Sequence, residues 1–254
     1  GFCTVYGDPH VMTFDKKRAD YYSPGEYWIV KSEKIKIQGR YLPTKMTSGL
    51  AVTKVVAIGG SLLKGNKLFI SSTSATYNGK PILTGFNSNF KVAGMFEAQY
   101  NGVGQVLQKG RAGKPLKVVH IKVYDGTPEG IMIQINRWTI ASEGNYVNVR
   151  ITMHPQPGQD GHCGNFNGNP ADDDRIQVRS RLGTQGVPVK ELLFKTKTPV
   201  VAANRPDIND CSADKLDTAH ALCQKKEGKL IPSMACLIDV CFGGKGFAQE
   251  NGAV

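Results

Sequence analysis

Hydrophobic and polar residues alternate in several stretches of the first two thirds of the chain. Val147, Val149 and Ile151 share one face of an extended segment. The residues between them, Asn148 and Arg150, share the other face. A period of two is typical of antiparallel strands with one buried face. Such alternation, or short apolar runs between turn residues, predicts strands at 27–31, 34–38, 50–58, 67–71, 90–99, 116–124, 130–136 and 146–154. We therefore predict a mainly β fold, an antiparallel β-sandwich.

The pattern changes after about residue 176. The stretch that follows is rich in proline, glycine and polar residues, which predicts a linker at 181–208 with a short helix near 189–195. The linker separates a sandwich domain, residues 1–180, from a small C-terminal segment, residues 209–254.

The sequence pattern of residues 209–254 predicts a small helical segment. Ser212 suits the N-cap of a helix that ends before Gly228, and a second short helix is expected within 233–241. A segment of this size buries little apolar surface by itself, so we expect disulfides to hold it together.

The cysteine count supports that expectation. The chain has an even number of cysteines with no CxxC pair and no histidine at zinc-ligand spacing, so disulfides fit better than zinc. The alternative is a set of reduced, buried thiols. Disulfides favour a secreted, extracellular protein, in which Gly1 follows a processed end, and no apolar run reaches the roughly 18 residues of a membrane span. The cysteines are Cys3, Cys163, Cys211, Cys223, Cys236 and Cys241.

The positive charge is concentrated in one part of the chain. The net charge is +11, and residues 31–122 contain fifteen Lys or Arg against only Glu33 and Glu97. Such a surface attracts acidic polysaccharide or an acidic protein face, or it is simply a solvated face that maintains solubility. No nucleic-acid-binding motif accompanies it, so nucleic acid is not an expected partner.

An acidic and amide-rich loop stands out against this basic background. From Asn165 the sequence NFNGNPADDD places side-chain oxygens at alternate positions and then in a carboxylate cluster. Calcium prefers six to eight such oxygens, and the loop can supply them. The glycine at the fourth position and Ile176 at the twelfth exclude an EF-hand. The alternative is a turn in which Asn and Asp side chains cap the backbone without a metal.

Two motifs resemble one known family. The stretches CTVYGDPHVMTFD at 3–15 and HCGNFNGNPADD at 162–173 are similar to the opening and closing motifs of the von Willebrand factor type D domain. That family occurs in gel-forming mucins, clotting and zonadhesin-like proteins, yolk lipoproteins and some luciferases. The resemblance covers about residues 1–180, and the tail ACLIDVC resembles the eight-cysteine module that often follows, here with four cysteines.

The resemblance implies a pairing and a ligand set. It implies a disulfide between Cys3 and Cys163, and it leaves three ways of pairing the four C-terminal cysteines. It also implies a calcium site, with Asp8 as a further ligand from the opening motif and a backbone carbonyl such as that of Ala171. The implied calcium ligands are Asp8, Asn165, Asn167, Asn169, Ala171, Asp172 and Asp173.

The Asp8-Pro9 bond is the one candidate for covalent chemistry. The Asp8 carboxylate can attack its own carbonyl, because a five-membered ring forms and proline nitrogen leaves readily once protonated. His10 could supply the proton, and certain mucin-type members of the family cleave themselves at the corresponding bond. The alternative is a structural role for Asp8 in the turn and the calcium site. No other enzyme motif is present, so we predict no catalytic residues and no enzymatic activity.

These observations predict a secreted, calcium-binding structural module. We expect it to self-associate or to bind other extracellular proteins as a subunit of a fibre, gel, coat or adhesive, because a basic face and an acidic loop permit head-to-tail docking. The alternatives are a self-cleaving protein, a luciferase-like enzyme fragment, and a module that binds acidic glycans.

Overall fold

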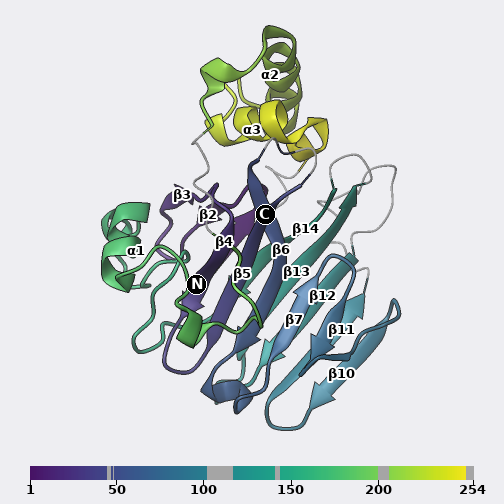
Figure 1. The fold of residues 1–254 in the computed structure, drawn as a ribbon, viewed down its shortest axis with the longest axis vertical. Helices are drawn as coiled ribbons and strands as arrows, with labels where there is room; N and C mark the ends of the chain where they lie inside the picture. The colour runs from purple at the N-terminus through teal and green to yellow at the C-terminus, as the bar shows by residue number, and fades with distance from the viewer. Residues whose placement is uncertain (45–46, 48, 102–116, 141–143, 200–205, 250–254) are drawn as a thin grey trace.

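The computed structural model describes residues 1–44, 47, 49–101, 117–140, 144–199 and 206–249. Within these residues the protein is mainly β, with two antiparallel sheets and a helical segment at one end (Figure 1). The prediction of a mainly β, antiparallel fold followed by short helices is therefore confirmed.

The larger sheet has eight strands in the described residues, in the order β10-β11-β12-β13-β14-β1-β2-β3. All its neighbouring strands pair antiparallel, and β1 lies between β14 and β2. The start of the chain thus lies inside the sheet. The strands are Phe2–Tyr6 (β1), His10–Met12 (β2), Arg18–Asp20 (β3), Ser88–Val92 (β10), Phe96–Asn101 (β11), Lys117–Val123 (β12), Ile131–Ile140 (β13) and Gly144–Thr152 (β14).

The smaller sheet has six described strands that follow one another in sequence order. Each strand pairs antiparallel with the next, which gives a simple meander. Its strands are Gly25–Lys31 (β4), Lys36–Pro43 (β5), Ala51–Gly59 (β6), Leu68–Ser71 (β7), Ala75–Tyr77 (β8) and Lys80–Pro81 (β9).

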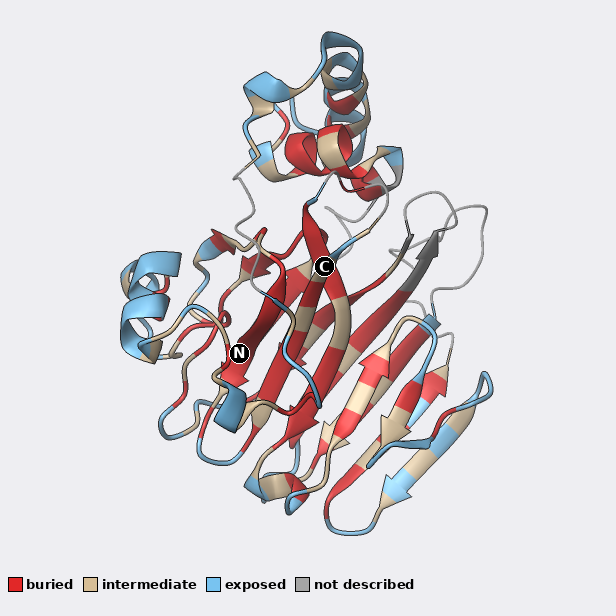
Figure 2. Ribbon diagram, in the orientation of Figure 1, coloured by how far each residue is buried: buried red, intermediate tan, exposed pale blue. Residues whose placement is uncertain are grey.

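The core lies between the two sheets. Val5 and Val149 from the larger sheet belong to the same buried cluster as Ile37 and Ile58 from the smaller one. The central strands are therefore mostly buried, whereas the outer strand β10 alternates between intermediate and exposed residues (Figure 2). The predicted alternation on β14 is only partly matched by burial, because Asn148 is also buried, at 2% exposure.

The strand predictions differ from the structure in several places. The short strands β1, β2, β3, β8 and β9 were not predicted. The single strand predicted at 90–99 is wrong: it is a hairpin, in which Gly94 has φ +68° and the Met95 amide donates to Val92 O. The glycine permits the left-handed conformation that reverses the chain. The strand predicted at 34–38 begins later, at Lys36, after a turn.

The helices differ more from the predictions. An α-helix at Arg175–Leu182 (α1) was not predicted. Val178 is its only buried residue, so its sequence lacks the apolar periodicity that indicates a helix. The helix predicted at 189–195 is a single 3₁₀ turn, Val189–Glu191. The other short 3₁₀ helices in the described residues are Ser61–Leu63, Pro170–Asp172, Ile208–Asp210 and Lys245–Gln249.

The C-terminal helices were predicted correctly. Helix α2 spans Ala213–Glu227, with Ser212 at its N-cap position and Gly228 in the left-handed conformation after it. Helix α3, Met234–Ile238, continues into a π-helical turn, Asp239–Gly243.

The C-terminal helices pack on one end of the sheets (Figure 1). The ring of Phe247 stacks on Tyr146 of β14 with centroids 5.2 Å apart. Ile238 packs with Tyr22 and Leu50 in a second contact. The small segment therefore gains apolar burial from the sandwich that it could not provide alone.

Three disulfides are present, which confirms that all six cysteines are paired. Cys3 pairs with Cys163, as the resemblance implied. The C-terminal pairing, which the sequence left open, is Cys211–Cys241 and Cys223–Cys236. The first of these links the start of the segment to its π-helical turn.

The Cys3–Cys163 bridge should contribute more stability than its C-terminal counterparts. It closes a loop with a sequence separation of 160, against 13 for Cys223–Cys236. In the chain-entropy model the long loop contributes about 5 kcal/mol and the short one about 3 kcal/mol. We predict that the double variant Cys3→Ala/Cys163→Ala loses more free energy of unfolding in urea than Cys223→Ala/Cys236→Ala. Equal losses, or a larger loss for the second pair, would contradict this.

Candidate functional site

The opening stretch and the acidic loop meet in the structure. The Phe14 amide donates to the Cys163 carbonyl at 3.0 Å, and the rings of Phe14 and Phe166 stack with centroids 4.6 Å apart. The carboxylate of Asp15 accepts from the amides of Asn167 and Gly168, each at 3.0 Å. Together with the disulfide, these contacts fix the loop against the start of the chain.

The three asparagines of the loop cap successive turns. The side-chain oxygens of Asn165, Asn167 and Asn169 each accept from the backbone amide two residues further on, at 3.2, 2.7 and 3.1 Å. This is the turn-capping role that formed the alternative to calcium. An amide oxygen has a second lone pair, so capping and ion binding are compatible.

Two carboxylate oxygens of the loop are buried without a hydrogen-bond partner in the described residues. They are Oδ1 of Asp172 and Oδ2 of Asp173. Asp173 is fully buried, and a Cβ on Gly164 would come within 2.1 Å of Asp173 Oδ2. Only glycine, here with φ +83°, lets the carboxylate lie so close to the backbone. Burial raises the pKa of Asp173, although hydrogen bonds to its carboxylate oppose the shift.

One arginine partly balances the negative charge of the loop. Arg181 of α1 binds Asp160 through two nitrogens, at 2.7 and 2.9 Å, and lies 3.5 Å from Asp173 Oδ1. It also donates to the carbonyl of Asp172. A single guanidinium thus faces the carboxylates of Asp160 and Asp173, with Asp172 beside them. The negative charge exceeds what this arginine neutralises.

Asp8 lies in a different cluster. Its Oδ1 is 2.9 Å from Nε2 of His10, and the same nitrogen is 2.7 Å from Oδ1 of Asp239. Nδ1 of His10 is 2.6 Å from Oδ1 of Asp20. The contacts described for Asp8 are therefore with His10 and the C-terminal segment, whereas the carboxylate that touches the acidic loop is that of Asp15. The role of Asp8 as a calcium ligand stays a prediction.

Burial and mutual charge shift the titration of this second cluster. Burial and then the neighbouring Asp239 raise the pKa of Asp8 well above its usual range. Burial alone would lower the pKa of His10, but the carboxylates of Asp239 and Asp8 outweigh it, and the pKa is raised. The neighbouring carboxylates thus favour the charged form of the imidazole.

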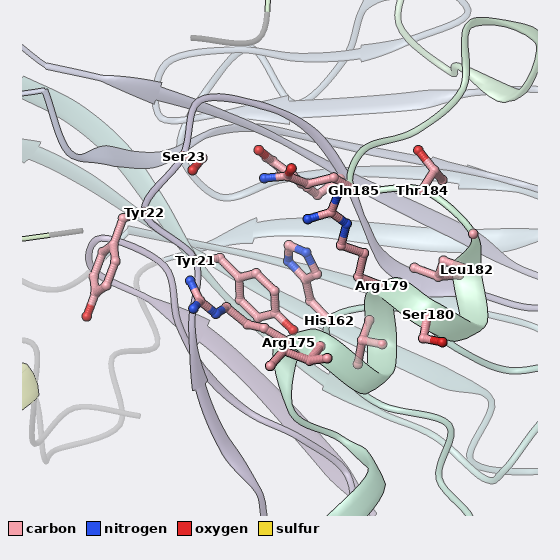
Figure 3. A pocket seen from close by; sticks show the side chains of 14 residues that line it. Tyr21, Tyr22, Ser23, His162, Arg175, Arg179, Ser180, Leu182, Thr184 and Gln185 are labelled. Atoms are coloured by element: carbon pink, nitrogen blue, oxygen red, sulfur yellow. The ribbon is translucent and has the colours of Figure 1, made fainter. Parts of the chain in front are cut away.

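A cavity of about 600 Å³ lies beside α1 (Figure 3). Tyr21 stacks on His162 with centroids 3.4 Å apart, and Arg175 and Arg179 of α1 lie on the helix side. Helix α1 forms one wall of this cavity and follows the acidic loop directly in the sequence. The position of the loop therefore also determines the position of that wall. The lining residues are Tyr21, Tyr22, Ser23, Tyr27, His162, Arg175, Ile176, Val178, Arg179, Ser180, Leu182, Gly183, Thr184 and Gln185.

Several basic side chains of residues 31–122 have partners within the protein. Arg40 pairs with the buried Glu26 at 2.7 Å, and Lys31 pairs with Glu191 at 3.2 Å. Lys122 donates to the carbonyl of Pro128. Residues 102–116 of the basic stretch lie outside the described part of the chain. The described charges are thus less available to a polyanion than their number suggests.

The sequence analysis did not identify several residues of these two sites. Asp15 ends the opening motif and could have been found there, since the motif was already assigned to the site. Asp160, Arg181 and Asp239 carry no local signal, because their partners lie far away in the sequence.

His162 provides a pH-dependent test of the fold. Burial lowers the pKa of His162 to about 3, and its Nδ1 lies 3.1 Å from the Tyr41 hydroxyl. The unfolded imidazole, with a pKa of about 6.5, therefore binds a proton that the folded one does not. Its contribution to stability is complete above pH 6.5 and is lost as the pH falls toward 3.

We predict that His162→Gln flattens the acid limb of the stability curve. Between pH 6 and 4 the wild-type free energy of unfolding should fall by about 1.4 kcal/mol per pH unit more than that of the variant, measured by urea titration. The control is His220→Gln, because His220 is exposed on α2. Parallel curves for wild type and His162→Gln would contradict the prediction.

Comparison with known proteins assigns no family. No protein-family model matches the chain, and no curated protein is significantly similar to it. The resemblance to the von Willebrand factor type D domain therefore stays a prediction from the two motifs. In the described residues, no helix combines the length and apolar character required to cross a bilayer.

Proposed function

We propose that the chain is a calcium-binding structural module of an extracellular assembly, and that it has no enzymatic activity. The observation that carries this proposal is the pair of buried, unpartnered oxygens on Asp172 and Asp173. Each carboxylate has partners at its other oxygen, but a buried carboxylate oxygen without one is costly, and a bound cation is one of the few ways to satisfy it.

The residues around these oxygens fit a hard cation. Carboxylates of Asp15, Asp172 and Asp173 lie beside the asparagines of the loop, and calcium accepts carboxylate and amide oxygens alike. Asp172 Oδ2 accepts from the side-chain amide nitrogens of Asn165 and Asn167, whose oxygens cap the turns. No lysine side chain contacts them in the described residues, and Arg181 is already engaged by Asp160. Bound calcium would neutralise the loop and connect it to the opening stretch through Asp15.

The extracellular setting is supported by the disulfides. Three bridges with no free cysteine are compatible with an oxidising compartment, where such bonds persist. Self-association is supported by charge: a net positive protein that carries one strongly acidic loop can dock head to tail. Calcium would modulate this contact, because it changes the charge of the loop.

We predict that calcium stabilises the protein and that Asp172→Asn and Asp173→Asn weaken this effect. At a hundredfold excess over its dissociation constant, calcium should add about 2.7 kcal/mol, or about 5–10 °C in Tm for a chain of this size. Thermal unfolding with calcium and with chelator measures the shift. Light scattering in the same two conditions measures self-association.

Asp174→Asn is the matched control, since it makes the same change of charge one residue away. Asp174 caps α1 by accepting from the amides of Ile176 and Gln177, and asparagine caps equally well. A calcium-induced shift that all three variants lose equally would indicate a general charge effect. No shift in the wild type would refute the calcium site, and a chain that stays monomeric in both conditions would refute the assembly.

Self-cleavage at Asp8-Pro9 is the second candidate function. The observation that favours it is the contact of His10 Nε2 with Asp8 Oδ1 at 2.9 Å. Attack of the Asp8 carboxylate on its own carbonyl carbon would form a cyclic anhydride and break the bond to Pro9. The Pro9 nitrogen would leave with a proton from the imidazolium of His10.

Electrophoresis distinguishes this candidate from the structural role. Because Cys3 is joined to Cys163, a cleaved chain would retain residues 1–8 until the disulfide is reduced. We predict an intact chain by mass spectrometry after reduction, since Asp8 is confined by the Asp239 and His10 contacts. Loss of residues 1–8 after reduction in the wild type, but not in Asp8→Asn, would establish cleavage instead.

A further inference from the structure

The cluster around His10 is separate from the acidic loop and has an unusual degree of burial. Asp8 and His10 are each 2% exposed, and Asp239 is fully buried. One donor atom from each of these three residues lies within 4.8 Å of the others. Asp8 and His10 come from the β1–β2 region, and Asp239 comes from the π-helical turn of the C-terminal segment.

One nitrogen in this cluster, Nε2 of His10, lies close to two carboxylates. Nε2 of His10 lies 2.7 Å from Asp239 Oδ1 and 2.9 Å from Asp8 Oδ1, yet an imidazole nitrogen carries at most one hydrogen. The hydrogen bond goes to Asp239, and both oxygens of Asp8 remain without a hydrogen bond in the described residues. The buried carboxylate of Asp8 therefore has an ion-pair contact with the ring but no hydrogen bond, which is costly at this degree of burial.

The geometry points to a divalent transition-metal site formed by Asp8, His10 and Asp239, for which Zn²⁺ is the fitting ion. Zinc takes imidazole nitrogen and carboxylate oxygen at about 2.0–2.2 Å, which places tetrahedral ligand atoms about 3.3 Å apart. The present separations of 2.7 and 2.9 Å require the side chains to move by only about half an ångström. Neither oxygen of Asp8 has a hydrogen bond in the described residues, although Oδ1 lies in the ion-pair contact with His10, so Asp8 can offer two ligand atoms.

The second nitrogen of His10 is arranged as in a zinc site. Nδ1 lies 2.6 Å from Oδ1 of Asp20, so a carboxylate orients the ring and increases the basicity of Nε2. The imidazole also favours zinc over calcium or magnesium, which prefer oxygen ligands alone. Asp20 is therefore a positioning residue, and its side chain is 38% exposed.

The backbone around Asp8 accommodates the third ligand. A Cβ on Gly7 would lie 2.9 Å from Asp239 Oδ2, so the glycine lets the C-terminal carboxylate approach the turn. The Gly7 amide donates to the buried Asn148 side chain, which ties the turn to β14. A metal ion here would join the sandwich to the C-terminal segment across a sequence separation of 229.

Protons alone could also hold these groups together, with His10 as an imidazolium and one carboxyl group protonated. Metal titration distinguishes the two explanations, because only the metal site binds one ion per chain and releases protons as it does so.

The test is a titration of the metal-free, disulfide-intact full chain with Co²⁺ in the presence of excess Ca²⁺, which occupies hard-oxygen sites. We expect one Co²⁺ per chain, with the visible absorption of a four-coordinate nitrogen and oxygen site, and its displacement by Zn²⁺. Asp239→Asn should weaken binding at least a hundredfold. Asp20→Asn should weaken it about 10–100-fold without removing the absorption band.

Two loop variants separate this site from the proposed calcium site. Asp172→Asn and Asp174→Asn should bind Co²⁺ as the wild type does, even if the calcium proposal fails. Near-ultraviolet circular dichroism and disulfide mapping establish that each variant is folded.

Results on the wild type and on one variant can overturn the proposal. Absence of stoichiometric Co²⁺ or Zn²⁺ by native mass spectrometry would do so, as would unchanged affinity in folded Asp239→Asn. If Asp239→Asn does not fold, the ring ¹⁵N spectrum of the wild type decides: Zn²⁺ must shift Nε2 of His10. A shift at another histidine instead would identify adventitious binding and refute the site.

Discussion

The pairing of β1 with β14 is the interaction on which the other features depend. It places Cys3 opposite Ile151, and the Met153 amide donates to the Gly1 carbonyl at 3.1 Å. A strand from the start of the chain thereby becomes an inner member of a sheet whose neighbouring strand is formed about 140 residues later. The disulfide and both carboxylate clusters take their positions from this register.

The turns before and after β2 supply carboxylates in two directions. Asp15 reaches the acidic loop, whereas Asp8 faces His10 and the C-terminal segment. In both places the protein removes carboxylates from water, which is unfavourable unless a proton or a cation accompanies them. The loop is partly balanced by Arg181, and the inner cluster by the imidazole of His10. The similarity of the two clusters is electrostatic, but their donor atoms differ, and so do the ions that suit them.

Local patterns in the sequence predicted the parts of the structure that have local causes. The alternation in 130–136 and 146–154 identified β13 and β14, because one face of each strand packs against the core. The α2 boundaries followed from Ser212 and Gly228. Helix α1 was missed because it is held by the loop and by Arg181 rather than by an apolar face. Only tertiary structure brings Asp239 to His10.

The Cys3–Cys163 bond also determines how the molecule would respond to mechanical load. Tension that enters the chain before Cys3 and leaves beyond Cys163 crosses directly through the sulfur atoms. The strands between these residues lie on a side branch of that path and are not stretched, so their hydrogen bonds need not resist the pull. Only the residues that follow Cys163 can then extend under load. Among the described ones, the Cys211–Cys241 bond protects the residues that it encloses from extension in the same way. A protein with these two bonds transmits force through a short covalent path, while its sheets remain folded.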